Sequence, residues 1–325
     1  MATSDEDIYS GLDRQLNSPE VPLAQRFRAL FTLKSLGGER AIQVIAKGFD
    51  GESALLGHEL AYCLGQLKDP RALPILTKVL EDDNEHVMVR HEAAEAMGAI
   101  GSDEALPVLR KYLKHDNAAI RETCEIAVDK IVFDNSDAGK TAGPNQYPCI
   151  DPAPAAASHS PLVSSAHSAA LSPASSDIPI PELEKTLLDT QLSLFERYRA
   201  MFALRNIGSR DAVLALAKGF DDESALFRHE IAFVFGQLSS PDSVPSLIEV
   251  LRRPHEEDMV RHEAAEALGG IATGDCLPVL KEFAQRDDVP RVVRESCVVA
   301  LDMYEYENSN EFVPLPTLPS ATASA

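Results

Sequence analysis

Apolar residues along this chain recur at the spacing of one helix face. In segments 89–98 and 105–109, apolar side chains recur three and four residues apart, which is the pattern of an amphipathic helix. The strict alternation that is typical of strands is nearly absent. Glycines stand where these helices are expected to end, and prolines stand in turns or first helical turns. The pattern therefore predicts an all-α protein.

The chain repeats itself at two lengths. Segment 46–50 matches segment 217–221 at an offset of 171 residues, so the two halves are duplicates. Within the first half, segment 60–65 parallels segment 93–98, which indicates a finer period of roughly 30 residues. Periods of this size are typical of solenoids, in which each repeat buries its apolar face against its neighbours.

The repeated unit is a Pro-bearing helix, a short acidic turn, and then the pattern Val-Arg-x-x-Ala-Ala-x-Ala-Leu-Gly. This unit resembles the HEAT repeat, an α-helical hairpin. The resemblance implies an α-solenoid of HEAT-like hairpins, in two mirrored halves of four hairpins each, with the second helix of each hairpin on the concave side. We expect hairpins to begin near Ala24, Ser53, Asn84, Asn117, Phe195, Ser224, Glu257 and Pro290.

Composition divides the chain into four segments. Between the halves it turns to Ala, Ser and Pro with few large apolar residues, and such a segment cannot bury enough surface to offset its ordering entropy. We therefore predict an N-terminal HEAT-repeat half at 1–133, a flexible linker at 134–181, a C-terminal HEAT-repeat half at 182–310, and a disordered tail at 311–325.

The net charge of the chain is strongly negative. With 325 residues, a formal charge of −21 and a pI near 4.8, the protein lacks the Lys and Arg excess that neutralises phosphates, so no nucleic-acid partner is expected. A cationic partner fits better. The chain has no apolar run long enough to span a bilayer and no signal-like start, so we expect no membrane association and a soluble, cytoplasmic protein. Five cysteines without CxxC spacing indicate neither a disulfide framework nor a thiolate zinc site.

The residues that can carry chemistry are four mirrored His-Glu dipeptides. They are His58-Glu59 and His91-Glu92 in the first half, and His229-Glu230 and His262-Glu263 in the second. Each pair is separated by 33 residues, and the second pair follows the first by 171 residues. Imidazole and carboxylate ligands without thiolate suit iron, manganese or zinc. Two His and one carboxylate per metal, with open positions, is the arrangement of oxygen-activating non-haem Fe(II).

Successive hairpins should bring these dipeptides together. Neighbouring helices pack about 8–10 Å apart, so His58 can converge with His91 and Glu92 on one metal ion. A second ion is expected at His229, His262 and Glu263. The remaining pair, Glu59 and Glu230, either completes or bridges the metal ions or binds the ammonium groups of a substrate.

Other residues of the same types are set aside. The dipeptide His255-Glu256 has Asn84 at its mirrored position, so duplication does not preserve it. His86 and His115 have no His at the mirrored position and should be solvated, and His159 and His167 lie within the linker. Acidic residues also precede the first dipeptide of each half. They either lie at solvated helix starts or attract a cationic substrate. These residues are Asp50, Glu52, Asp221, Asp222 and Glu223.

Three classes of function are compatible with this pattern. One is an oxygenase with paired iron ions. Another is a binuclear metallohydrolase, which also uses His and carboxylate with two metals. The third is a non-enzymatic HEAT scaffold whose His-Glu pairs bind a structural metal or nothing.

The dipeptides and their neighbours resemble one family closely, the deoxyhypusine hydroxylases. The resemblance rests on segment 57–62 with Gly65-Gln66, segment 90–96, segment 228–233 with Gly236-Gln237, and segment 261–267. It covers both helical halves but neither the linker nor the tail, and all eight His and Glu positions are present. It implies a monooxygenase with two Fe²⁺ ions that uses O₂ to hydroxylate the deoxyhypusine side chain of translation factor 5A to hypusine. That side chain is a long polyamine, which an acidic cleft would attract.

Overall fold

The computed structural model describes residues 5–49, 52–141, 145–156 and 178–309. Every regular element among them is helical. The helices of the first half are α1 (Asp5–Asn17), α2 (Leu23–Leu36), α3 (Gly38–Ala46), α4 (Ala54–Gln66), α5 (Leu73–Glu81), α6 (Val87–Ile100), α7 (Leu106–Lys111) and α8 (Ala118–Asn135), followed by the short α9 (Asp137–Lys140). Those of the second half are α10 (Ile180–Leu188), α11 (Leu194–Ile207), α12 (Arg210–Ala217), α13 (Ala225–Leu238), α14 (Val244–Arg252), α15 (Asp258–Ile271), α16 (Cys276–Ala284) and α17 (Arg291–Glu307).

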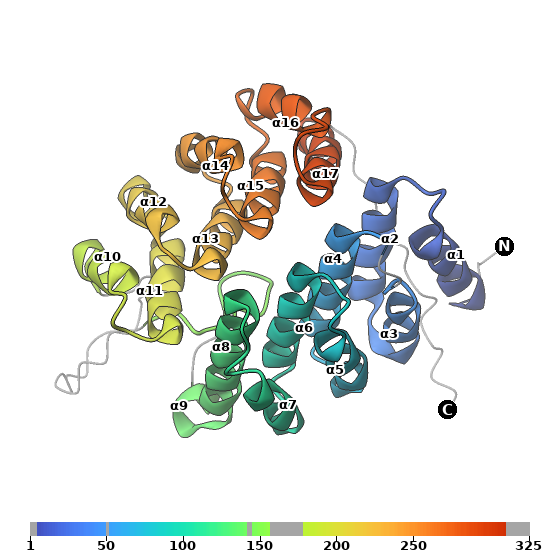
Figure 1. The fold of residues 1–325 in the computed structure, drawn as a ribbon, viewed down its shortest axis with the longest axis horizontal. Helices are drawn as coiled ribbons and strands as arrows, with labels where there is room; N and C mark the ends of the chain where they lie inside the picture. Colours follow the sequence, from blue (N-terminus) through green and yellow to red (C-terminus); the bar gives the residue numbers. More distant parts are fainter. Residues whose placement is uncertain (1–4, 50–51, 142–144, 157–177, 310–325) are drawn as a thin grey trace, which may run out of the picture.

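These helices form four hairpins in each half, as the sequence predicts. The outer layer consists of α1, α3, α5 and α7 in the first half and of α10, α12, α14 and α16 in the second (Figure 1). The inner layer consists of α2, α4, α6 and α8 in the first half and of α11, α13, α15 and α17 in the second. The expected hairpin starts are displaced by one helix. Ser53 and Asn117, for example, cap the inner helices α4 and α8. Each hairpin begins earlier, with the outer helix, which carries a proline in α5, α7, α10, α14 and α16.

A buried arginine joins the two helices of four hairpins. In each case the Nε–H of an arginine on the inner helix donates to a carbonyl in the last turn of the outer helix, ten residues earlier. The donors and acceptors are Arg26 and Leu16 (2.7 Å), Arg90 and Leu80 (3.0 Å), Arg197 and Leu187 (2.9 Å), and Arg261 and Leu251 (3.1 Å). Helix ends leave carbonyls without intrahelical partners, so this bond fixes where the outer helix stops.

Small residues let successive inner helices approach closely. A Cβ placed on Gly65 of α4 would lie 2.7 Å from the Cα of Ala96 on α6, and one placed on Gly269 of α15 would lie 2.7 Å from the Cα of Ala300 on α17. No side chain fits at such distances, so the repeated Gly and Ala positions set the spacing of the inner layer.

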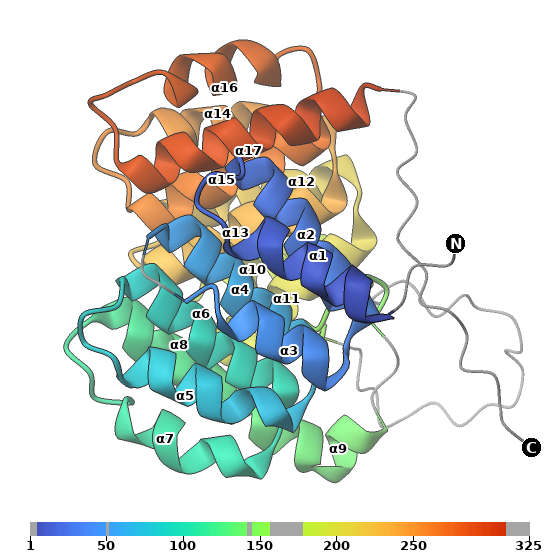
Figure 2. The same ribbon diagram turned by 90° about the vertical axis from the view of Figure 1, so that its right-hand side faces the viewer.

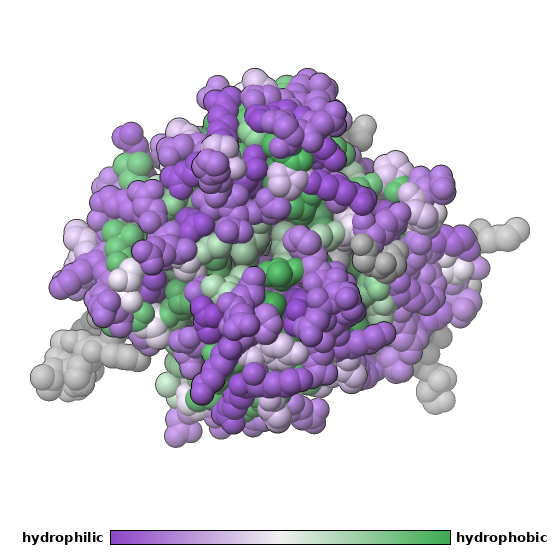
Figure 3. All heavy atoms as spheres, in the orientation of Figure 1, coloured by the Kyte–Doolittle hydropathy of each residue, from purple (hydrophilic) through white to green (hydrophobic). Residues whose placement is uncertain are grey.

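The two halves face each other across their inner helices. Helix α17 packs against α2 and α4, and α8 packs against α11 and α13, so the halves meet at both edges (Figures 1 and 2). We call the region between the facing inner helices, where their side chains meet, the central space. The surface in Figure 3 is mostly hydrophilic, with apolar residues gathered around its centre. None of the described helices is long and apolar enough to cross a membrane.

The segment expected to be a flexible linker contains packed structure. Helix α8 continues to Asn135, and Asn145–Ala156 lies against both halves with Asp151, Pro152 and Ala153 buried. The expectation failed here because an Ala/Pro-rich composition does not reveal a buried ion pair with a distant residue, Arg205. Residues 157–177 and the predicted tail at 311–325 lie outside the described residues.

Candidate metal centre

Each His-Glu dipeptide occupies the same place on its helix. The histidine is the fifth residue of α4, α6, α13 and α15, at His58, His91, His229 and His262 respectively. The starts of α4 and α13 are fixed by Ser53 and Ser224, whose side chains accept hydrogen bonds from backbone N–H groups three residues later. Because the helices start in register and face each other, all four dipeptides point into the central space.

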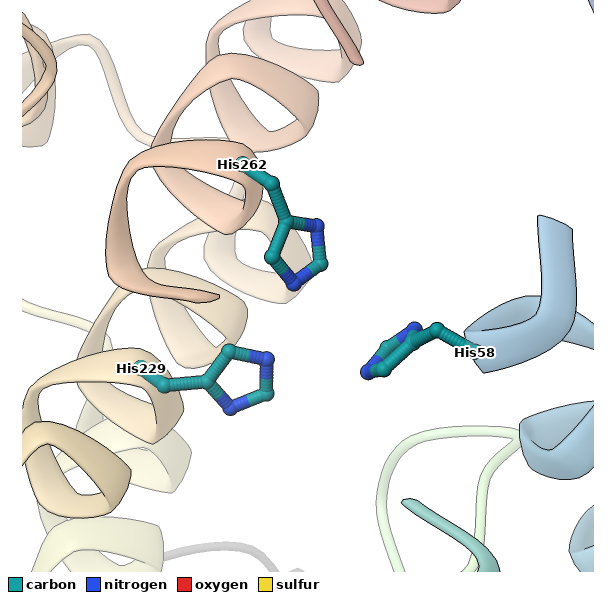
Figure 4. Close-up of side chains that lie close together, drawn as sticks. All are labelled: His58, His229 and His262. Carbon is teal, nitrogen blue, oxygen red and sulfur yellow. The ribbon is translucent and has the colours of Figure 1, made fainter. Parts of the chain in front are cut away.

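The four imidazole rings form one cluster. The centroid of the His58 ring lies 5.5 Å from that of His91 and 5.8 Å from that of His229. The His262 ring lies 4.9 Å from His58 and 5.4 Å from His229, and His91 lies 5.4 Å from His229. Figure 4 shows His58 reaching from one half toward His229 and His262 of the other. Residues that are 171 positions apart in the sequence therefore meet at one point.

Most of the ring nitrogens in this cluster have no hydrogen-bond partner. His91 and His262 are completely buried, and within the described residues neither nitrogen of either ring is hydrogen-bonded. The same holds for both nitrogens of His229. Buried polar atoms in folded proteins are normally paired, and several unpaired imidazole nitrogens at one point are what a metal site requires.

Carboxylates complete the cluster. Glu59 Oε1 lies 3.2 Å from Nδ1 of His58, and Glu92 Oε2 lies 3.2 Å from Nε2 of the same ring. In the second half, Glu263 Oε2 lies 3.6 Å from Nε2 of His229. Glu230 is 1% exposed, and its Oε1 has no hydrogen-bond partner among the described residues. The site thus offers oxygen as well as nitrogen donors from both halves.

The donor atoms fall into three overlapping groups in which all atoms lie within 4.8 Å of one another. The groups are His58 with His91 and Glu92, His58 with His229 and His262, and His262 with Glu263 and Glu266. The first is the ligand set expected for one metal ion. The set expected for the other ion is divided between the second and third groups, so His229, His262 and Glu263 are near each other but do not form one such group.

Burial sets the charge of the imidazoles. It lowers the pKa of His91, His229 and His262 well below the usual value, and neighbouring imidazoles lower it further. For His58, burial also acts to lower the pKa, but Glu92 and Glu59 raise it well above the usual value. Three of the four rings are therefore neutral at physiological pH, the form that binds a metal.

The carboxylates of the second half are shifted in the opposite direction. Burial raises the pKa of Glu230 well above its usual value, with further contributions from the charges of Glu95 and Asp151. Burial also raises the pKa of Glu263, to about 8, where Glu59 and Glu92 act in the same direction and His58 opposes them. So many carboxyl groups cannot all be ionised at close range without cations between them.

Two further glutamates belong to this region and were not among the predicted residues. Glu95 and Glu266 follow Glu92 and Glu263 by three positions, on the same helix face. Glu266 Oε1 lies 3.7 Å from Nδ1 of His262. A carboxylate beside the second nitrogen of a ligating imidazole orients the ring and raises its basicity. Their mirrored positions in the repeated His-Glu-Ala-Ala-Glu sequence could have identified them.

The residues set aside from the sequence lie outside the cluster. His255 is exposed, and its neighbour Glu256 pairs with Arg228. His86 and His115 each accept a hydrogen bond from a backbone N–H two residues later, at helix starts or turns. His159 and His167 lie outside the described residues.

The acidic turns mostly have local partners. Asp222 forms a buried ion pair with Arg197, and Glu52 lies 3.6 Å from Arg26 across a weaker contact. Asp221 is exposed and lies 3.4 Å from Arg253. Glu223 is also exposed, and Asp50 lies outside the described residues. Asp222 is thus a structural residue rather than a solvated one.

The donor set fits transition-metal ions such as iron. Neutral imidazoles and carboxylates are the ligands that such ions take in place of thiolates, and they are supplied here in near-equal number by two duplicated halves. Two ions with incomplete protein ligation would leave positions open for a reactant. A closed structural zinc site, by contrast, usually uses four protein ligands.

Comparison with protein families identifies the repeats. The family of HEAT repeats matches residues 44–129 and 214–302, and the family described as PBS lyase HEAT-like repeat matches residues 196–222. The first of these covers more than half of the 325-residue chain. Both solenoid halves are therefore HEAT repeats, as the sequence pattern indicates.

Three relatives that match more than nine-tenths of the chain are deoxyhypusine hydroxylases. Deoxyhypusine hydroxylase of Lentinula edodes is 58% identical over 322 residues, which is 96% of each chain. The enzymes of Drosophila melanogaster and Rattus norvegicus are 53% and 50% identical over 91% and 94% of this chain, and over 91% and 95% of their own lengths.

A solved structure agrees with these relatives. The structure of human deoxyhypusine hydroxylase in complex with glycerol is 48% identical to this chain and superimposes with a TM-score of 0.84. The match covers 93% of this chain and 97% of that one. Likeness in sequence, fold and length together shows that this chain belongs to the deoxyhypusine hydroxylase family.

Proposed function

We propose that this protein hydroxylates the deoxyhypusine side chain of translation factor 5A to hypusine, using two Fe²⁺ ions and O₂. The observation that carries this proposal is the cluster of four buried imidazoles with unpaired nitrogens, surrounded by the carboxylates of mirrored His-Glu dipeptides. Membership of the deoxyhypusine hydroxylase family supports the reaction. As the substrate is part of a translation factor, we place the activity in the cytoplasm.

In this proposal each half holds one ion. His58, His91 and Glu92 bind the first, and their donor atoms already lie within 4.8 Å of one another. His229, His262 and Glu263 bind the second. Within this second set, Glu263 Oε2 lies 3.6 Å from Nε2 of His229, and the His229 and His262 rings are 5.4 Å apart. The pair of irons supplies the oxidant for an aliphatic C–H bond, which no protein side chain can supply.

The reaction balances with one further reactant. One oxygen atom of O₂ replaces the C–H bond by C–OH, and the other leaves as water, so two electrons and two protons must come from a reductant. The protein's own residues bind the ions, orient the substrate chain and exclude bulk water. Burial of all four histidines supports this last role, because none is more than 4% exposed.

Glu59 and Glu230 are the residues proposed to bind substrate cations. The free Oε1 of Glu230 is an acceptor for an ammonium group, and Glu59 is its mirrored counterpart. If instead they ligate the metal, iron content will fall when they are replaced. We therefore propose to measure both iron content and affinity for a deoxyhypusine-bearing substrate in Glu59→Ala and Glu230→Ala.

A direct test uses purified protein loaded with Fe²⁺, a deoxyhypusine-bearing form of translation factor 5A, a chemical reductant and isotopically labelled O₂. We expect one labelled oxygen atom per hypusine formed. His91→Ala should lose activity and iron together, whereas His255→Ala, which removes an exposed histidine, should retain both. Iron-loaded wild-type protein that forms no hypusine contradicts the proposed function.

A further inference from the structure

One segment breaks the twofold repetition of the molecule. Residues Asn145–Ala156, which we call the strap, connect the halves in sequence and have no duplicate at an offset of 171. In Figure 1 this light-green segment lies between the two halves, beside α8 and α13. Its backbone is held at the far end by Arg199, whose carbonyl accepts from the N–H of Ala156 at 2.8 Å. The strap is therefore part of the packed structure.

A buried ion pair anchors the centre of the strap. Both oxygens of Asp151 accept from the guanidinium of Arg205 on α11, at 2.8 and 2.7 Å. Arg205 is 1% exposed and Asp151 is 8% exposed. Asn145 accepts from the same guanidinium and donates to Asp151. Since a buried charge is stable only when its partners satisfy it, this network fixes the strap against the second half.

Two mirrored glutamines hold the strap from both halves. Gln66, at the end of α4, accepts from the N–H of Ile150 at 2.8 Å and donates to the carbonyl of the same residue at 3.3 Å. Its duplicate Gln237, near the end of α13, donates to Sγ of Cys149 and accepts from Arg205 at 2.7 Å. The two glutamines, which occupy duplicated positions in the halves, thus both bind the strap, which is present once.

The strap lies directly behind the candidate metal centre. A cavity of about 10 Å³ is lined by Ile150 and Pro152 of the strap and, on its inner side, by Glu92, Glu95 and other residues of α4 and α6. A cavity of this size holds about one water. On the side of the second half, the charge of Glu230 contributes to raising the pKa of Cys149. Ile150 and Pro152 of the strap therefore border the same small cavity as Glu92 of the centre.

The opposite end of the central space is built differently. The strap meets the C-terminal ends of α4 and α13, whereas His58 and His229 stand in their second turns, about 12 Å away at 1.5 Å per residue. At the N-terminal ends, a cavity of about 460 Å³ opens between the halves, lined by Arg26 and Ser53 from one and Arg294 from the other. It includes none of the eight His and Glu residues, and Ser53 and Glu295 in its lining are hydrogen-bonded to each other across the halves.

We propose that the strap is a plug that closes the C-terminal end of the central space behind the metal centre. Gln66, Gln237, Asp151 and Arg205 act as positioning residues that hold this plug. Its function is to keep water and small reductants from reaching the centre from behind during hydroxylation.

Variants that release the strap without removing a buried charge test this proposal. Gln66→Leu keeps the volume of the side chain but removes both bonds to Ile150, and Gln66→Leu with Gln237→Leu removes the contacts from both halves. Asn135→Ala is the control, because Asn135 bonds to Gly101 and Asp103 at the same end of the molecule and not to the strap. Asp151→Asn is a stronger variant, but it leaves Arg205 with a weakened partner and can unfold the protein.

Three quantities are measured on iron-loaded protein: hydrogen exchange of the strap, the rate of iron loss to a small chelator, and O₂ consumed per hydroxyl formed. Gln66→Leu removes two hydrogen bonds to the strap, which should increase local opening of the strap by about tenfold. The double variant also removes the bond from Gln237 to Cys149, and its iron loss should rise by about tenfold or more. More O₂ should be consumed per product, with Asn135→Ala unchanged in all three.

Two results would overturn the plug. Exchange of the strap could rise while iron loss and O₂ coupling stay at wild-type values, or exchange could remain unchanged in the double variant. The plug proposal rests on the proposed function, because two of its three measurements need iron-loaded protein. Iron analysis before each assay therefore distinguishes a failure of the proposed function from a failure of the plug. A chain that takes up no iron contradicts the function, whereas a loaded chain indifferent to strap opening contradicts only the plug.

Discussion

Ser53 and Glu295 join the two halves beside the metal centre. The Ser53 hydroxyl donates to Glu295 Oε2 at 2.7 Å, across 242 residues of sequence. The duplicated serine, Ser224, makes the same bond to Glu122 at 2.6 Å. Each serine also caps the helix that carries a His-Glu dipeptide. One side chain therefore fixes both the start of the helix and its position against the other half.

Replacing Ser53 should destabilise the protein more than the loss of a helix cap alone. A cap contributes about 1 kcal/mol, and a hydrogen bond to a carboxylate contributes about 1.5–3 kcal/mol. We expect Ser53→Ala to lower the free energy of unfolding by about 2–4 kcal/mol in denaturant titrations. Ser209→Ala, which removes a cap at an exposed position without a contact between halves, should lose about 1 kcal/mol. Equal losses in the two variants would contradict the role of the bond between halves.

The close approach of inner helices can be tested with a mirrored pair of glycines. A Cβ on Gly65 would lie 2.7 Å from the Cα of Ala96, whereas a Cβ on Gly236 would lie 3.5 Å from the Cα of Ala267. Gly65→Ala should therefore destabilise the fold by about 1–3 kcal/mol through overpacking. Gly236→Ala should be neutral or stabilising by up to about 1 kcal/mol, because alanine favours the helix. Thermal unfolding of both variants measures the difference, and a similar effect of the two substitutions would be inconsistent with the described packing.

The sequence determines much of this fold because its signals are periodic and duplicated. Helix spacing predicts the hairpins, and the 171-residue offset separates His58 and its counterparts from His255, which proves to be exposed. The strap could not be predicted, because Asp151 finds its partner Arg205 at a distance of 54 residues in an otherwise unremarkable Ala/Pro-rich segment. Glu95 and Glu266 were missed because a glutamate on a HEAT helix is usually solvated, whereas these two are half-buried beside the metal centre.

Glu266 should support the metal centre without being required for the fold. Its carboxylate lies 3.7 Å from Nδ1 of His262, and loss of such a partner typically lowers metal affinity by about 10–100-fold. We expect Glu266→Gln to weaken Fe²⁺ binding by at least about tenfold in a competition titration. Glu305→Gln, at an exposed position of α17, is the control and should bind iron as the wild type does. Undiminished affinity in Glu266→Gln would remove Glu266 from the centre.

The strap gives the protein a pH-dependent thiol. Burial, with Asp151 acting in the same direction, raises the pKa of Cys149 to about 12. Since only the thiolate is nucleophilic, alkylation of Cys149 should be slow at pH 8 and should keep increasing with pH beyond 9. When the strap is released by Gln66→Leu, the pKa should fall toward its ordinary value, and alkylation at pH 8 should become faster. Mass spectrometry of the alkylated protein distinguishes Cys149 from the other four cysteines, all of which are buried. Alkylation that already levels off near pH 9 in the wild type would contradict the packed strap.

The central claim is that two duplicated halves together hold two metal ions. Quantitative iron analysis of the purified, Fe²⁺-loaded chain tests it most directly, in the wild type and in His58→Ala, because His58 belongs to donor groups from both halves. We predict two irons per chain in the wild type and a clear loss in His58→Ala, with His255→Ala unchanged. A fully loaded wild type with a single iron, or a His58→Ala protein that keeps two, would contradict the account.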